Sequence, residues 1–220
     1  MQFEERAYGV DMWVCTKQLI TDITSDNGMF QKLFAYITGA NDRQEKIEMT
    51  SPVSTMRQKS TKGEIHEQCF YLYEKDPPKP TAEDVYLVKR EAMNVYTRTV
   101  MKRMSEKDWL KESAAMDKLV ASQKLKIKEN VWYAAGYSAP FSAIQKNEVW
   151  KVKAVKAFDA PRNDLQTPEY KVVKTFESDG EKVVFNLEIS RSRILEISRV
   201  FFDLAISRLK ARDLEILVFN

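Results

Sequence analysis

The side chains that most often perform catalysis are scarce or isolated in this sequence. His66 is the only histidine, so neither a multi-histidine metal site nor an H-E-x-x-H helix can form. The six glycines form no phosphate-binding motif, and no serine lies in a G-x-S-x-G nucleophile elbow. Acidic residues are abundant, but their spacing marks no two of them as a general acid and base. The sequence therefore predicts a protein that is not an enzyme.

Cys15 and Cys69 are the remaining candidates for redox or metal chemistry. They are far apart, and neither belongs to a C-x-x-C motif. Each lies beside large apolar residues, so both are predicted to be small apolar core residues. A disulfide framework would need more cysteines, and we therefore expect a reducing, cytoplasmic compartment.

Charge and hydropathy exclude two classes of partner. The 35 basic and 32 acidic residues are interleaved, and the net charge is only +3. Nucleic-acid binding would need a clustered basic face, so we expect no nucleic-acid partner. The N-terminal segment is charged and lacks the apolar stretch of a signal peptide, and no apolar run is long enough to span a membrane.

What remains as a candidate for function is a set of aromatic and aliphatic side chains. Phe30, Phe34 and Ile37 fall on one face of a helix that is predicted to be capped by Ser25 or Asp26. A stripe of this kind is more often ordinary core than the wall of a ligand site. The stripe alone leaves both interpretations open.

The elements that position this helix follow one order twice. Each half is predicted as a two-stranded hairpin, a helix and two further strands. In the first half these are the hairpin 2–17, the helix ending at Gly39, and the strands 47–53 and 69–73. In the second half they are the hairpin 85–100, a helix starting at the capping-box-like Ser105–Asp108, and the strands 131–136 and 147–152. Two pseudo-repeated βαβ halves predict an α+β fold, with a curved, barrel-like antiparallel sheet and two main helices.

Several short segments are informative as a set, because each is weak alone but their order is specific. They are Phe3–Arg6 followed by Tyr8, Phe34–Asn41, Ile47–Val53, Asp76–Pro80, Ala135–Tyr137 with Pro140, and Asn147–Trp150. In this order they resemble the SOUL haem-binding protein family. The resemblance covers residues 1–155 and implies the same fold of two βαβ halves.

The resemblance also implies a ligand and a place for it. It implies reversible binding of haem or metal-free porphyrin in the cytosol, as a carrier or buffer. In the family the ligand is placed in a hydrophobic groove between the first helix and the loop before the last strand. The matching positions are Phe30, Phe34, Ile37, Tyr137, Phe141 and Lys146. Lys32, Arg43 and Lys146 are the candidates for pairing with the ligand's propionates.

One position departs from the family pattern. Ala7 stands where some members carry a histidine that is proposed as an axial iron ligand. Without a strong axial histidine, we expect binding that is indifferent to the metal and a site that does not tune redox chemistry.

The resemblance stops after Lys156, so residues 156–220 form a C-terminal extension. Residues 157–166 are predicted as a linker, and 168–177 as a strand of the kind that family members have before their first Glu-x-Arg strand. This strand could begin a truncated second copy or fold back to complete the sheet. Residues of about 188–212 could form a helix, although a poorly ordered extension is the simpler interpretation. An alternative function follows, in which the domain is a protein-interaction scaffold acting through the second helix or this extension.

Overall fold

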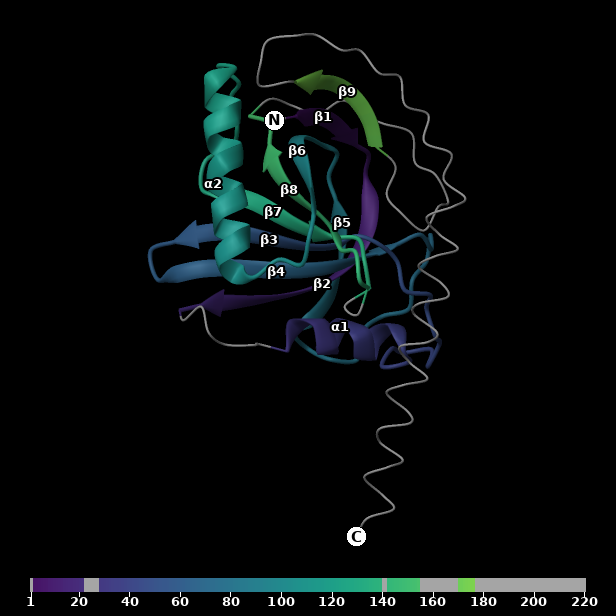
Figure 1. Cartoon of the computed structure of the whole chain (residues 1–220). Helices are drawn as coiled ribbons and strands as arrows, with labels where there is room; N and C mark the ends of the chain where they lie inside the picture. Colours follow the sequence, from purple (N-terminus) through teal and green to yellow (C-terminus); the bar gives the residue numbers. More distant parts are fainter. Residues whose placement is uncertain (1, 22–27, 140–141, 155–169, 177–220) are drawn as a thin grey trace.

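The computed structural model describes residues 2–21, 28–139, 142–154 and 170–176. In chain order the elements are β1 (Phe3–Tyr8), β2 (Asp11–Ile20), α1 (Met29–Ile37), β3 (Val53–Ser60), β4 (Gly63–Leu72), β5 (Val85–Arg90), β6 (Met93–Met101), α2 (Glu106–Ser122), β7 (Val131–Gly136), β8 (Lys146–Val152) and β9 (Tyr170–Phe176). The strands form one sheet in the order β5-β2-β4-β3-β7-β8-β6-β1-β9, with antiparallel pairing between neighbours. The sheet is curved and carries two helices (Figure 1), so the predicted α+β fold is confirmed.

The two predicted hairpins do not form, although their strands do. β1 pairs with β6, and β2 pairs with β4 and β5, so the short connections after Tyr8 and after Arg90 join strands that are not neighbours. Tight two-residue hairpins require positive φ angles in the turn. Neither Gly9 nor the Glu91-Ala92 pair has one. The chain therefore crosses at these points from one half of the sheet to the other.

Because the chain crosses at both points, the two halves of the sheet have equivalent strand orders. The order β5-β2-β4-β3 in one half corresponds to β1-β6-β8-β7 in the other, and the halves meet where β3 pairs with β7. Each half therefore takes its outermost repeat strand from the other half. The two-fold repetition predicted from the sequence is confirmed, with an exchange of first strands that periodicity did not predict.

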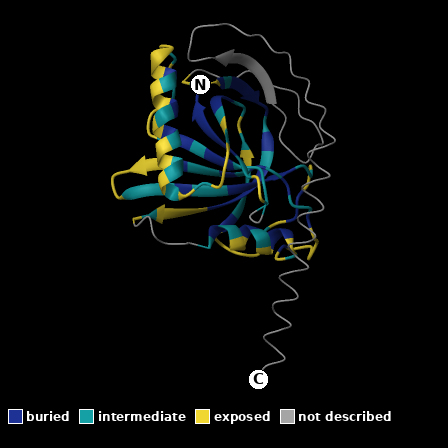
Figure 2. Ribbon diagram, viewed as in Figure 1, coloured by how far each residue is buried: buried dark blue, intermediate teal, exposed yellow. Residues whose placement is uncertain are grey.

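Both helices cover the same face of the sheet, one over each half. α1 packs Leu33, Tyr36 and Ile37 against a cluster that includes Val14 and Phe70. α2 packs Met116 and Val120, with the partly buried Trp109 and Leu119, against a cluster that includes Tyr96 and Val149. Figure 2 shows the buried sides of the helices turned toward the strands. Within the described residues, no helix is long and apolar enough to cross a membrane.

The predicted N-terminal cap is present in α2 but not described in α1. α2 begins with the predicted capping box, in which the Ser105 side chain accepts from the Asp108 N–H and the Asp108 carboxylate accepts from the Ser105 N–H. α1 instead begins after Gly28, a left-handed residue with φ of 64° and no side-chain cap. The expected caps Ser25 and Asp26 lie outside the described residues.

The other face of the sheet carries neither helix, and we call it the uncovered face. The name refers to the helices only, because most aromatic side chains on this face are buried. Because side chains alternate along a strand, Val149 points to α2 while its neighbours Glu148 and Trp150 point the opposite way. The uncovered face carries aromatic side chains from both halves: Tyr8, Trp13, Tyr71, Tyr133 and Trp150. Arg90 joins the halves, because its guanidinium carbon lies 4.0 Å from the ring centroid of Trp13 and 5.2 Å from that of Tyr133.

The predicted strand 47–53 is wrong, because regular pairing starts only at Val53. The Ser51–Pro52 peptide bond is cis, and Pro52 has no N–H to donate to a neighbouring strand. The Ile47 N–H donates to the Ile37 carbonyl at the end of α1, at 2.8 Å. β3 then runs without a break to Ser60.

The expectation of two separate core cysteines is also wrong. Cys15 and Cys69 are directly opposite on β2 and β4, and their sulfurs form a disulfide. Both residues are fully buried, as predicted. Sequence separation hid the pairing, since only the register of two strands brings the cysteines together. The step from cysteine number to a reducing compartment fails with it, and a cytoplasmic location stays a prediction.

The C-terminal extension supplies an additional strand. β9 pairs antiparallel with β1 at the edge of the sheet, so this segment folds back to complete the sheet, which was one of the two expectations for it. The predicted linker 157–166 and the helix at about 188–212 lie outside the described residues.

Truncation of Met116 tests the packing of α2. Met116 is fully buried, and Met116→Ala is expected to lower the free energy of unfolding by about 2–5 kcal/mol, because it leaves a cavity under the helix. Urea denaturation measures the loss. Lys118→Ala, an exposed change on the same helix, is the matched control. Equal effects of the two changes would contradict the described packing.

Candidate functional site

α1 carries the aromatic part of the predicted site. Phe30 and Phe34 are one turn apart, and their rings stack with centroids 6.0 Å apart and planes 15° apart. Both side chains are half-buried, and Phe30 also meets the buried Phe70 edge-on at 5.3 Å. Ile37 is buried in the core cluster. The two phenylalanines therefore present ring surface at the edge of the core, whereas Ile37 supports the helix from below.

The predicted cations near α1 are held by surface carboxylates. The Lys32 Nζ lies 2.5 Å from the Asp84 carboxylate, and a hydrogen bond from Lys32 lowers the pKa of Asp84. The Arg43 guanidinium donates to the Asp76 carboxylate at 2.6 Å and to the Asp76 carbonyl at 3.0 Å. Exposed ion pairs of this kind contribute about 0–1 kcal/mol, so a carboxylate on a ligand could replace Asp84 or Asp76 at small cost.

A recess of about 440 Å³ adjoins the first of these pairs. It is lined by Lys17, Glu83, Asp84 and Tyr86. The Tyr86 hydroxyl donates to the Glu67 carboxylate at 2.7 Å. Three of the four lining residues carry a charge, but most of the surface that they present to the recess is apolar.

The other predicted residues lie at the base of the β7–β8 loop. The Tyr137 N–H donates to the Lys146 carbonyl at 3.0 Å, and the Lys146 Nζ lies 4.5 Å from the centroid of the Tyr137 ring. Phe141 lies outside the described residues. Within the same loop, Ile144 is 67 % exposed, an apolar side chain that the sequence argument did not select.

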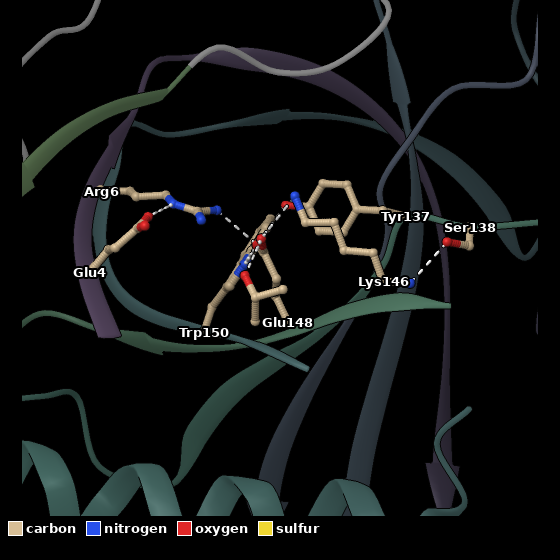
Figure 3. Close-up of polar contacts among 8 residues, drawn as sticks. Glu4, Arg6, Tyr137, Ser138, Lys146, Glu148 and Trp150 are labelled. Carbon is tan, nitrogen blue, oxygen red and sulfur yellow. Dashed lines mark hydrogen bonds and ion pairs between the residues drawn. The ribbon is translucent and has the colours of Figure 1, made fainter. Parts of the chain in front are cut away.

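The charged residue at the centre of this second group is Glu148 (Figure 3), which sequence reasoning also missed. Its carboxylate is fully buried and accepts hydrogen bonds from Arg6 Nη1 at 2.8 Å, Tyr137 Oη at 2.8 Å and Trp150 Nε1 at 2.9 Å. The Lys146 Nζ is 3.4 Å away, and Arg6 also pairs with Glu4 at 2.8 Å. The only sequence signal was a glutamate directly before Val149 and Trp150 in a predicted strand, because a buried glutamate needs a buried partner.

The balance of charge around Glu148 decides its ionisation. Burial alone would raise the pKa of this carboxyl, but the charges of Arg6 and Lys146 outweigh it and hold the pKa below its usual value. Burial and the Glu148 charge together raise the pKa of Tyr137 well above the usual tyrosine range. Glu148 is therefore an anion at neutral pH, while Tyr137 is a neutral donor.

The predicted residues thus fall into two groups. Phe30, Lys32 and Phe34 are on α1, which packs on the helix-covered face, with Arg43 in the segment that follows it. Tyr137 and Lys146 contact Glu148 on the uncovered face.

The positions that could ligate a metal do not form an iron site. Ala7 is fully buried and pairs with Asn94 and Lys171, so the chain offers no histidine there. His66 is buried on β4 and its Nε2 lies 2.6 Å from the Glu64 carboxylate. Cys15, Glu67 and Cys69 place possible ligand atoms within 4.8 Å, but the two sulfurs are bonded to each other. The family's histidine position is thus an alanine in this chain, and His66 is already paired with Glu64.

Neutralising Glu148 tests the buried cluster. Glu148→Gln leaves the Arg6 guanidinium without its buried counterion and is expected to cost about 3–5 kcal/mol of unfolding free energy at pH 7. Because the folded pKa of Glu148 is lowered, its contribution is complete above the usual carboxyl value of 4.5 and is lost as the pH falls through the folded pKa. The gap between wild type and variant should therefore narrow on acidification, as measured by urea midpoints from pH 7 to pH 3.

Glu4→Gln is the matched control for this experiment, since Glu4 pairs with the same arginine but its side chain is 34 % exposed. A Glu148→Gln variant no less stable than Glu4→Gln would show that the buried pair is not a major stabilising contact.

The chain is similar to several known proteins. The family model described as SOUL heme-binding protein matches residues 1–152. Heme-binding protein 2 of Mus musculus is 31% identical over 160 residues, which cover 69% of this chain and 78% of that protein. Heme-binding protein 2 of Homo sapiens is 29% identical over 161 residues, with the same coverage. Heme-binding protein 1 of Mus musculus is 26% identical over 164 residues, covering 70% of this chain and 85% of that protein.

Solved structures share the fold at lower sequence identity. A cryo-EM structure of an EcmrR–DNA complex matches with a TM-score of 0.54 and 12% identity, over 70% of this chain and 57% of that one. The crystal structure of the EcmrR C-terminal domain matches with a TM-score of 0.50 and 11% identity, over 70% of this chain and 98% of that one. These likenesses concern the fold alone. The family model and the heme-binding relatives, which match the domain that carries both groups of site residues, establish that the chain belongs to the SOUL heme-binding protein family.

Proposed function

We propose that this chain binds a tetrapyrrole, haem or metal-free porphyrin, reversibly between α1 and the β7–β8 loop. The observation that carries the proposal is the stacked, half-buried pair Phe30 and Phe34 on α1. A flat apolar ligand packs on such rings, and its propionates pair with nearby ammonium or guanidinium groups. The relatives named Heme-binding protein 1 and 2 support the choice of ligand class.

The residues on each side of the ligand have different roles in this proposal. Phe30 and Phe34 contact one face or edge of the macrocycle, while Ile37 holds the helix in place from the core. Lys32 and Arg43 exchange their present carboxylates for propionates. On the loop side, Tyr137 and Lys146 contribute a polar edge, with Phe141 as a further candidate from the sequence alone.

Magnitudes favour moderate affinity. Covering about 300 Å² of apolar porphyrin surface contributes roughly 7 kcal/mol at ~25 cal/mol/Å². A micromolar dissociation constant requires about 8 kcal/mol, and association has an entropic cost of its own. Hydrophobic contact therefore needs the help of charge pairing. This balance suits a protein that takes up and releases its ligand, as a carrier or buffer. The cytoplasm is kept as the proposed compartment from the family resemblance alone, because the Cys15–Cys69 disulfide removes the argument from cysteine number.

The same balance argues for binding without catalysis. Ala7 removes the family's proposed axial histidine, and His66 is occupied by Glu64. A protein that holds the macrocycle by its periphery leaves the reactivity of the iron unadjusted, because axial ligands are the main means by which proteins set it. We therefore propose that the chain is a binding protein, with no reaction assigned to this site.

Titration with two ligands tests the proposal. Haemin and metal-free protoporphyrin should each give a saturable change in absorbance or fluorescence, with dissociation constants that agree within about tenfold. No saturable change with either ligand would refute tetrapyrrole binding. Binding of haemin alone, with the spectrum of a six-coordinate histidine complex, would refute the inference drawn from Ala7.

Truncation of one ring tests the place of binding. Phe34→Ala removes half of the stacked pair, and we expect affinity for metal-free protoporphyrin to fall about tenfold or more, the equivalent of about 1.4 kcal/mol. Gln31→Ala, an exposed change on the same helix, is the matched control and should leave affinity unchanged. Tight binding by the Phe34→Ala variant would move the ligand away from α1 while leaving the ligand class intact.

A further inference from the structure

The edge of β1 is occupied by a strand from far along the chain. β9 pairs with β1 along its whole length, from Phe3 opposite Phe176 to Tyr8 opposite Tyr170, with one irregularity between Glu5 and Arg6. β1 is the only strand with which β9 pairs among the described residues. Without β9, the outward N–H and C=O groups of β1 would form an open sheet edge, a template for another strand.

The connection to β9 does not dictate which copy of the chain it serves. β8 ends at Val152 and β9 begins at Tyr170, so residues 153–169 lie between the strands. A segment of this length spans more than about 50 Å when extended, which is larger than a small domain's radius. A strand on such a connection can reach the β1 edge of its own chain or that of a neighbouring copy.

The internal repeat shows that this fold forms sheets from exchanged strands. β1 and β5 each pair in the half to which the rest of their own repeat does not belong. The edge formed by β5 is the counterpart of the β1 edge, and within the described residues no strand pairs with its outer side. β9 is therefore an addition to one edge of a symmetric arrangement, held there by the pairing with β1.

We propose that the edge of β1 is a strand-acceptor site and that residues 170–176 of a second copy can occupy it. Two chains then exchange β9 and form a closed dimer with two identical β1–β9 pairings. Every backbone hydrogen bond of the exchanged pairing also exists within one chain, so exchange creates no new interface to be stabilised. The occupant is the same segment, in the register of Glu4 opposite Thr175 and Ala7 opposite Lys171.

Concentration decides between the two forms. A strand tethered by a segment of this length has an effective concentration of about millimolar at its own acceptor edge. The monomer is therefore the main species at micromolar concentration. Exchanged dimers accumulate when chains refold together at high concentration, because the β1 edge and β9 are then both free to choose partners.

Cysteine pairs in the full-length chain test this proposal. Glu4→Cys and Thr175→Cys place one thiol on each strand at opposite positions. The native Cys15 and Cys69 are buried and bonded to each other, so they do not compete. Copies carrying only Glu4→Cys are mixed with copies carrying only Thr175→Cys, unfolded, refolded together at high concentration and oxidised. We expect a cross-linked dimer of twice the 25.6 kDa monomer mass on a non-reducing gel.

Two controls make the outcome decisive. The off-register mixture of Glu4→Cys with Lys171→Cys should give at least tenfold less dimer, since Lys171 lies opposite Ala7. The double variant Glu4→Cys with Thr175→Cys should cross-link within one chain at low concentration. Cross-linking of the double variant without any dimer from the mixture would overturn the proposal, because β9 would then serve only its own chain. Absence of cross-linking in both would overturn the β1–β9 pairing on which the proposal rests. Neither outcome depends on tetrapyrrole binding.

Discussion

The buried ion pair between Arg6 and Glu148 constrains the rest of the structure more than any other contact. It joins β1 to β8 across the intervening β6, over 142 residues of sequence. A carboxylate without water is tolerated only when charged and polar partners replace its hydration. Arg6, Tyr137, Trp150 and the more distant Lys146 provide that replacement. The uncovered face is consequently packed around a charge. If β1, which carries Arg6, left the sheet, the Glu148 carboxylate would lose its buried counterion.

This constraint positions one of the two sides of the proposed ligand site. Tyr137 and Lys146 are fixed by Glu148, whereas Phe30 and Phe34 are fixed by the apolar cluster under α1. One side of the site is therefore positioned by electrostatics and the other by packing. Lys32 and Arg43 are held less firmly than either group, because their exposed partners Asp84 and Asp76 can be exchanged at little cost. A site of fixed rings and exchangeable cations suits a ligand with a flat apolar body and an anionic rim.

The exchange of strands between repeats ties the two halves of the sheet together. Because β1 and β5 cross to opposite halves, the repeats interlock instead of lying side by side. Arg90, between Trp13 of one half and Tyr133 of the other, adds a cation to the aromatic contact across the junction. β9 adds one more strand at the β1 edge, and this strand has no counterpart at the β5 edge among the described residues.

The sequence by itself determined what depends on neighbouring residues. Short spacings predicted the capping box of α2 and its apolar stripe of Met116 and Val120. The order of segments predicted the repetition of the two halves and the family. The tertiary structure decided what depends on which distant strands meet. Sheet register determines the partners of β1 and β5 and the position of β9. It also brings together Cys15 with Cys69 and Arg6 with Glu148. Register is set by contacts summed over the whole sheet, so no local window of sequence contains it.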